Sequence, residues 1–314
     1  MIEVAERSIE EIPLTIAIPT YNRRHTVQVL LNSICDQARS GDEVIVSDDG
    51  STDGTAELLS KVPGVKVIRH DINQGLVANW NTCLHAATRD WICIVHDDDR
   101  LEPGALDALR CACALAKGPA LILHQYAGHV FDGGFRYIFS EPSPGTILNC
   151  PMIPSGAVLH RTIMDAVGFF DPHYKYFADL EYFPRIITRF PLIIIESPHI
   201  VEYRRHGENY QFHAARNADF YDLFEEMQRL IISYAGIQDE KQKRDILDKK
   251  MVGALFYTLD MADRIGDRRL VRLVGKRCLM LRHRLTSVQK VKAYVSAITG
   301  WCPRARRAER LRPL

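Results

Sequence analysis

The N-terminal part of the chain alternates short, mostly apolar runs with segments of helical periodicity. Apolar runs bounded by polar residues are typical of buried strands, and they occur at residues 14–18, 43–47, 65–68, 91–95 and 120–124. Helical spacing of apolar residues predicts helices between them, at 27–34, 56–60, 76–87 and 103–116. Strands that alternate with helices predict an α/β fold built on a doubly wound, mostly parallel sheet.

The pattern changes after Gln125. An Asp-Gly-Gly turn predicts a hairpin over residues 130–137, and the proline-rich segment 142–154 is expected to be a long functional loop. Helices are predicted near 162–167 and 179–188, and a strand at 192–195. Beyond residue 207 the chain is mostly helical, so we expect one domain over 1–206 and a helical C-terminal region over 207–314.

Charge is distributed unevenly along a chain whose formal net charge is +1. From Arg264 to the end, 15 Lys and Arg residues accompany two acids. A basic tail predicts an anionic partner, either membrane phospholipid or nucleic acid, although solvated helix faces would show the same pattern. The mixture of basic and apolar residues in 268–274 favours an anionic membrane surface, and no nucleic-acid reader motif is found.

The composition otherwise indicates a protein of the cytoplasm. No apolar stretch approaches the length of a membrane span, and the polar, acidic N-terminus is unlike a secretory signal. The eight cysteines include no Cys-x-x-Cys pair, which favours reduced thiols over a zinc site. Together with the basic tail, this predicts a cytoplasmic protein at the inner face of a membrane.

Polar segments follow several of the predicted strands. Residues 18–23 and 46–55 follow the first two strands, residues 73–79 open a helix, and His96-Asp97-Asp98-Asp99 follows the fourth strand. Strand ends in a parallel sheet converge, so these segments should line one edge. Three adjacent carboxylates repel one another, and a divalent cation with phosphate ligands would relieve this, whereas a solvated acidic turn is the simpler alternative.

These segments together resemble the family 2 glycosyltransferases of the GT-A fold. The matching motifs are I-P-T-Y-N-R, D-D-G-S-T-D-G-T, N-x-G-x-x-x-N and H-D-D-D, and the resemblance covers roughly residues 12–206. It implies an inverting, Mn²⁺- or Mg²⁺-dependent enzyme that uses a UDP, dTDP or GDP sugar. The implied acceptor is a saccharide or a lipid-linked hydroxyl, in polysaccharide or glycolipid assembly.

The resemblance places the nucleotide at the first strand ends. Asp49 matches the acid that accepts hydrogen bonds from the base, Thr20 and Tyr21 flank the base, and Asp97 matches the residue near the ribose. Tyr21 could instead be ordinary edge packing. Asp48, Asp53 and Thr55 are expected to have turn and capping roles. The implied nucleotide contacts are Pro19, Thr20, Tyr21, Arg23, Asp49, Gly75, Asn79 and Asp97.

The resemblance also supplies a metal and phosphate set. Asp98 matches the metal ligand beneath the diphosphate, with Asp99 and His206 as further ligands, and Arg204 matches a phosphate-binding position. The family often has Asp where this chain has His96, which leaves open whether His96 contacts the nucleotide or only closes the strand.

The acceptor side resembles the family in a second region. Asp179 matches the general base, although Ala178 replaces the usual preceding Glu, and an N-cap role for Asp179 is the alternative. Ser155, Gly156 and Glu181 match acceptor-side positions. A glycosyltransferase-like binding or scaffold protein without turnover is a second hypothesis, whereas nucleotidyl transfer would need a basic Gly-rich loop that is absent.

Overall fold

The computed structural model describes residues 12–126, 135–151, 154–197, 200–203, 214–217, 219–281, 285–300 and 302. The chain divides into two compact units, Met1–Arg204 and Arg205–Leu314. The predicted boundary after residue 206 lies in the undescribed segment 204–213, so the exact division between the domains stays a prediction.

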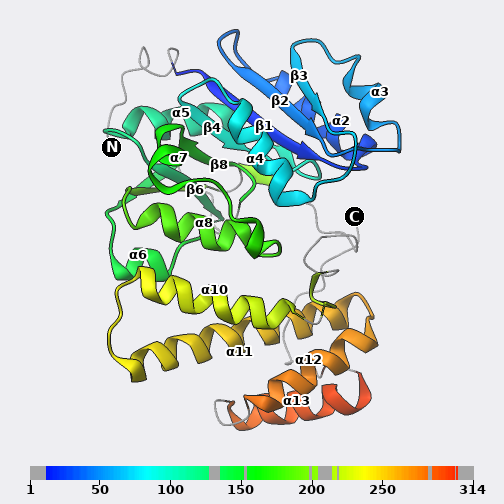
Figure 1. Ribbon diagram of the computed structural model, residues 1–314, viewed down its shortest axis with the longest axis vertical. Helices are drawn as coiled ribbons and strands as arrows, with labels where there is room; N and C mark the ends of the chain where they lie inside the picture. The colour runs from blue at the N-terminus through cyan, green and yellow to red at the C-terminus, as the bar shows by residue number, and fades with distance from the viewer. Residues whose placement is uncertain are drawn as a thin grey trace. The chain divides into compact units, whose positions relative to one another are not determined.

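The first unit is built around an eight-stranded sheet (Figure 1). Its order is β3-β2-β1-β4-β8-β6-β9-β7, and β7 and β8 run antiparallel to their neighbours. All seven residues of β1 are buried, which explains the continuous apolar run. The strands are β1 Leu14–Thr20, β2 Glu43–Asp48, β3 Val65–Arg69, β4 Trp91–Ile94, β6 Leu121–Tyr126, β7 Arg136–Ser140, β8 Ala157–His160 and β9 Leu192–Ser197.

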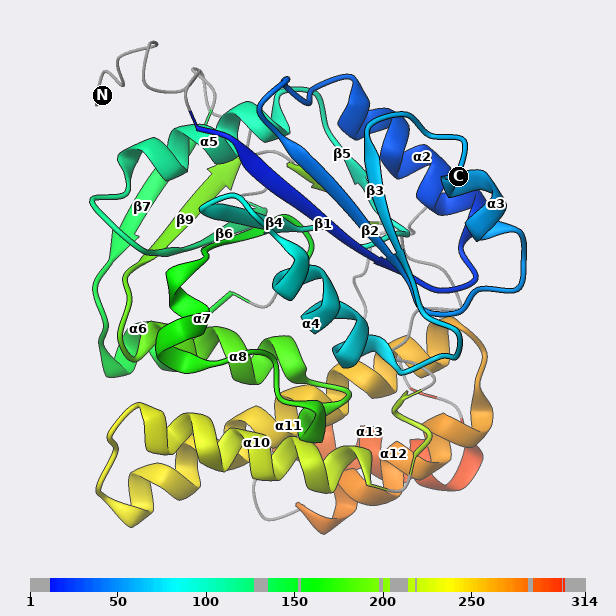
Figure 2. The ribbon, with the colours of Figure 1, turned by 45° about the horizontal axis from the view of Figure 1, so that its top comes forward.

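Helices cover both faces of this sheet (Figure 2). Helix α2 buries Val27, Leu30, Leu31 and Ile34 in the same core cluster as residues of α5, and α4 packs against β1 and β2. The predicted α/β fold with a mostly parallel sheet is therefore confirmed. The helices are α2 Arg24–Cys35, α3 Thr55–Leu59, α4 Leu76–Ala86, α5 Ala105–Leu115, α6 Pro144–Leu148, α7 Thr162–Val167 and α8 Ala178–Ile187, with a 3₁₀ turn at Pro172–Tyr174.

Several details differ from the sequence prediction. Strand β8 was not predicted, because a four-residue strand between two longer ones carries little periodicity. Strand β7 pairs with β9 and not with the preceding β6, and the predicted Asp-Gly-Gly turn at 132–134 lies outside the described residues. The predicted loop contains α6, whose start is capped by Ser143. A small sheet of β5 Arg100–Leu101 and β10 Val201–Glu202 was also missed.

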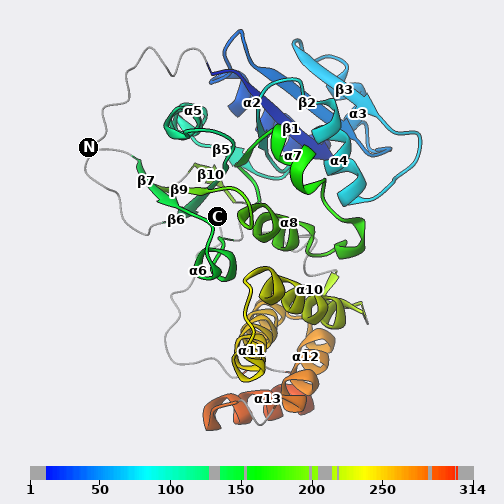
Figure 3. The same ribbon diagram turned by 60° about the vertical axis from the view of Figure 1, so that its left-hand side comes forward.

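The second unit is helical, as predicted. It contains α10 Phe220–Tyr234, α11 Glu240–Arg264, α12 Arg268–Met280 and α13 Ser287–Thr299. Figure 3 shows each of these helices beside the next in sequence. Side chains of Asp239, Asp267 and Thr286 accept backbone N–H groups and fix the starts of α11, α12 and α13. Among the described residues, no helix is long and apolar enough to cross a membrane.

Candidate active site

The carboxyl ends of β1, β2 and β4 meet at one edge of the sheet. Thr20 pairs with Asp48 across β1 and β2, and the Val95 N–H donates to the Ala17 carbonyl at 3.0 Å where β4 ends. The polar segments that follow these strands therefore converge, as the parallel topology predicts. This edge holds most of the predicted donor-binding residues that the structure describes.

Asp49 is buried and holds the turn that leads into α4. Its Oδ1 accepts the Gln74 N–H at 2.8 Å, and its Oδ2 accepts the Gly75 N–H at 2.9 Å. Gly75 has φ +93°, a conformation that glycine adopts without strain. Each carboxylate oxygen keeps a second lone pair, so Asp49 can still accept a hydrogen bond from a base. The base contact itself stays a prediction.

Asn79 ties two strand ends together. Its Nδ2 donates to the Thr20 carbonyl at 3.2 Å and to the Ser47 carbonyl at 3.0 Å. Its Oδ1 is buried without a hydrogen-bond partner among the described residues. The observed contacts are therefore structural, and a contact from Asn79 to a nucleotide stays a prediction.

Short polar side chains stabilise the turn after β2 through hydrogen bonds to its backbone, as the sequence predicted. Asp48 accepts the Ser51 N–H at 3.0 Å, and Asp53 accepts the Thr55 N–H at 3.0 Å. Asp53 also accepts the Arg24 N–H at 3.1 Å, which joins this turn to the start of α2. These residues shape the edge of the sheet.

Asp97 lies beside β1. Thr20 Oγ1 donates to Asp97 Oδ2 at 2.7 Å, and the positive charge of Arg23 is close enough to act on this carboxyl group. Desolvation by the surrounding protein, with a contribution from the charge of Asp98, raises the pKa of Asp97 to about 7. Pro19 is buried in β1, whereas the Tyr21 side chain is 44% exposed and accessible to a ligand.

His96, Asp98 and Asp99 form a candidate cation site. One ligand atom from each residue lies within 4.8 Å of the others, and Asp99 is fully buried. Two carboxylates and an imidazole suit a divalent ion such as Mn²⁺. The structure thus places His96 with the predicted metal residues Asp98 and Asp99. His96 was not predicted among the metal ligands, and its place directly before Asp97-Asp98-Asp99 was the only sequence feature that pointed to this role.

The imidazole of His96 is held by its neighbours. It stacks on Trp80, with 5.4 Å between ring centroids and 24° between the planes. The backbone N–H of His96 donates to Ser155 Oγ at 3.1 Å, and the Ser155 carbonyl is hydrogen-bonded to His124 Nε2 at 2.7 Å. The two remaining predicted residues, His206 and Arg204, lie outside the described residues.

Ser155 and Gly156 fix the end of β4. Ser155 is buried, and the Gly156 N–H donates to the Ile94 carbonyl at 2.7 Å. Gly156 has φ +83°, and a Cβ there would lie 2.8 Å from Val201 Cγ2. Both conditions require glycine. These contacts position the acid run, and the predicted acceptor contacts of Ser155 and Gly156 stay predictions.

Asp179 is the second residue of α8. The N-cap position belongs to Phe177 and has no side-chain cap hydrogen bond, so Asp179 is not the N-cap that the sequence allowed. Desolvation raises the pKa of Asp179, and the nearby charge of His96 lowers it. Asp179 is therefore close enough to His96 for electrostatic interaction, which relates the predicted base to the candidate metal group.

Glu181 is buried and engaged in an ion pair. Arg185 Nε donates to Glu181 Oε1 at 2.8 Å, and Arg185 Nη2 donates to Oε2 at 2.9 Å. Arg185 also donates to the carbonyls of Val167 and Phe169, which precede α8. Glu181 thus orders this part of the fold, and the predicted acceptor contact stays a prediction.

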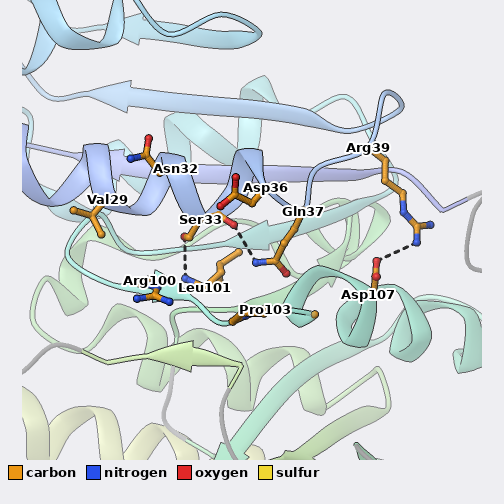
Figure 4. A pocket seen from close by; sticks show the side chains of 11 residues that line it. Val29, Asn32, Ser33, Asp36, Gln37, Arg39, Arg100, Leu101, Pro103 and Asp107 are labelled. Carbon is orange, nitrogen blue, oxygen red and sulfur yellow. Dashed lines mark hydrogen bonds and ion pairs between the residues drawn. The ribbon is translucent and has the colours of Figure 1, made fainter.

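A separate open pocket of about 620 Å³ lies between α2 and the start of α5 (Figure 4). Arg39 and Asp107 form an ion pair at 3.0 Å beside it, and Ser33 Oγ accepts the Leu101 N–H at 3.1 Å. None of the predicted site residues lines this pocket. The chemistry at the strand ends is therefore the better guide to function.

A model of the family described as Glycosyl transferase family 2 matches residues 15–141, which include the strand ends and the acid run. Residues 15–141 are thus similar to glycosyltransferase family 2. A curated relative, the succinoglycan biosynthesis protein ExoO of Rhizobium meliloti, is 31% identical over 160 residues, covering 49% of this chain and 46% of ExoO. The chain spans between 46% and 67% of the length of the first relatives it matches.

Solved structures show the same GT-A type of fold. S. aureus TarS in complex with UDP-GlcNAc is 18% identical with a TM-score of 0.60, covering 91% of this chain and 87% of that chain. The mannosyltransferase PcManGT from Pyrobaculum calidifontis, in complex with GDP-Man and Mn²⁺, is 16% identical with a TM-score of 0.54, covering 90% and 84%. At these identities the likeness concerns the fold.

Proposed function

We propose that this protein is a family 2 glycosyltransferase, inverting and metal-dependent, that moves a sugar from a nucleoside diphosphate sugar to a hydroxyl acceptor. The observation that carries the proposal is the group of His96, Asp98 and Asp99 at the strand ends, with Asp179 near His96. Carboxylates that hold a cation and a separate carboxylate that accepts a proton are what such a transfer requires.

The proposed donor is a UDP, dTDP or GDP sugar. Asp49 can accept hydrogen bonds from the N–H edge of uracil, thymine or guanine. Tyr21, which directly follows the end of β1, offers an exposed aromatic ring. Support also comes from the fold neighbours, which were solved with UDP-GlcNAc and with GDP-Man. Asp97, near Thr20 and Arg23, is the proposed ribose contact.

The donor set of the site fits Mn²⁺ or Mg²⁺. Asp98 and Asp99 would hold the ion with hard oxygen ligands, and His96 adds a nitrogen that Mn²⁺ accepts more readily than Mg²⁺. A bound divalent ion would neutralise charge on the departing diphosphate. His206 and Arg204 stay proposed as a further ligand and a phosphate contact.

Asp179 is the proposed base. An acceptor hydroxyl is a weak nucleophile, so a carboxylate must take its proton as the new glycosidic bond forms and the diphosphate leaves from the opposite face. A desolvated carboxylate with a raised pKa is a stronger base than an exposed one, and desolvation raises the pKa of Asp179. Inversion follows from the single displacement.

The proposed acceptor is a saccharide or a lipid-linked hydroxyl, and the proposed role is polysaccharide or glycolipid assembly at the inner face of a membrane. The similarity to ExoO, a succinoglycan biosynthesis protein, supports the polysaccharide role. Ser155, Gly156 and Glu181 remain the proposed acceptor-side residues, although their observed contacts are internal.

The test is hydrolysis of a panel of nucleotide sugars with and without Mn²⁺. Asp98→Asn and Asp179→Asn are each expected to lower kcat by at least about a hundredfold. Asp36→Asn, an exposed acid at the end of α2, is the matched control and should keep full activity. Equal activity of all three variants would contradict the site assignment. Donor binding with no turnover in the native chain would favour a binding protein.

A further inference from the structure

Helix α12 exposes a row of basic and apolar side chains. Arg269, Arg272, Leu273, Lys276 and Met280 are all exposed, and we call these five residues the α12 stripe. Their spacing of three, four, seven and eleven residues from Arg269 places them on one side of a helix. Leu273 is 39% exposed and Met280 is 77% exposed, so aliphatic surface lies within the basic row.

The opposite side of α12 fixes the direction of the stripe. The buried residues of α12 are Leu270, Val271, Val274, Gly275 and Cys278. A Cβ on Gly275 would lie 2.6 Å from the Ala297 backbone nitrogen, so α12 lies directly against α13 at this point. This packing holds the stripe outward on the helical unit.

Within the described part of the chain, the stripe is positive without local compensation. Helix α12 contains five basic residues and no acid, whereas α11 contains six basic and five acidic residues. Among the described residues, no acid lies within ion-pair distance of the three basic members of the stripe, while the neighbouring Arg277 pairs with Asp222 at 3.2 Å. An uncompensated positive row attracts an anionic surface.

We propose that the α12 stripe docks the protein on an anionic phospholipid surface, with its basic side chains at the headgroups and Leu273 and Met280 inserted among them. Basic residues interspersed with exposed aliphatic ones are typical of helices that lie in a membrane interface. Nucleic acid would use the positive charge but offers no apolar layer to the two aliphatic side chains. The inference goes beyond the proposed sugar transfer and does not depend on the chemistry at the strand ends.

The test is flotation of the full chain with vesicles of phosphatidylcholine alone or mixed in equal parts with phosphatidylglycerol. Binding is expected to the mixed vesicles and to weaken with added salt. The triple variant Arg269→Gln, Arg272→Gln, Lys276→Gln should bind about a hundredfold more weakly, because each basic residue near an anionic surface contributes a few-fold to about tenfold.

Two further variants separate the parts of the proposal. Lys241→Gln, Arg244→Gln, Lys249→Gln removes the same charge from exposed positions on α11 and should retain at least a tenth of the binding. Leu273→Ser with Met280→Ser keeps every charge and should weaken binding about tenfold. Unchanged far-ultraviolet circular dichroism and donor hydrolysis in each variant would show that the fold and the active site are intact.

Three outcomes would overturn the docking proposal: no binding of the native chain to mixed vesicles, equal losses in the α11 and α12 charge variants, or tighter binding to duplex DNA than to vesicles. Donor hydrolysis by the native chain is measured separately, so its absence would count against the proposed function and leave the docking result standing.

Discussion

Replacing Glu181 by glutamine is expected to destabilise the sheet-containing unit, because it removes one charge of a buried ion pair. The Glu181 side chain is 2% exposed and the Arg185 side chain 21% exposed. Breaking a buried pair by neutralising one member costs about 3–5 kcal/mol, and the partial exposure of Arg185 reduces this to about 2–3 kcal/mol. For a unit of this size, that loss lowers Tm by roughly 4–12 °C.

A double-mutant cycle tests the origin of this loss. Arg185→Met alone removes the guanidinium partner of the buried Glu181 carboxylate, and it also removes the donors to the Val167 and Phe169 carbonyls. Glu181→Gln with Arg185→Met should therefore be more stable than the sum of the single changes predicts, by about 2 kcal/mol. Urea and thermal unfolding of the four proteins measure the coupling.

The same variants decide between two roles of Glu181. If the carboxylate acts by ordering the segment before α8, Glu181→Gln lowers Tm while the acceptor KM changes little below the melting range. An unchanged Tm together with a large rise in acceptor KM would refute this reasoning and support the acceptor contact predicted from the sequence.

Three more predictions concern the strand-end site. The acid limb of the pH profile of kcat should lie above the usual Asp range, since desolvation raises the pKa of Asp179. Asp97→Asn should raise the Tm of the metal-free protein above pH 7 and weaken donor binding. As the pH falls below about 7, the native carboxyl group is protonated while the unfolded one stays ionised, so the Tm gain should shrink steadily and disappear only below the ordinary Asp pKa of 3.8. Gly156→Ala should lower Tm and hydrolysis together, since its Cβ would meet Val201 in a left-handed conformation.

The elements that sequence predicts best are those whose pattern is repeated and local. Helix α2 was predicted from four apolar residues at helical spacing, and the same four are buried. Where a single backbone conformation sets a helix boundary, the observed boundary differs from the predicted one. The helix predicted from Pro103 begins at Ala105, because Gly104, with φ +80°, is the N-cap of α5. Strand β8 depends on pairing with β4 and β6, a non-local condition that a four-residue run does not encode.

The site residues divide in the same way. The strand ends placed Thr20, Asp49 and Asp97 at one edge because parallel strands align their carboxyl ends. Sequence could not show that His96 lies with Asp98 and Asp99, because the direction of its ring depends on stacking with Trp80 from another element. The ion pair between Glu181 and Arg185 joins residues four apart on one helix, so it could have been predicted from the sequence.

The observed contacts also give a physical reason for residues at this edge to serve more than one purpose. Asp49 accepts two backbone N–H groups of the turn before α4, and Asn79 of α4 donates to the ends of β1 and β2. Each residue therefore fixes the other's surroundings before any ligand binds. A site arranged in this way loses less conformational entropy on binding a donor. Asp49→Asn should consequently weaken donor binding partly by loosening the turn at Gly75, and faster hydrogen exchange of the α4 amides would measure that contribution.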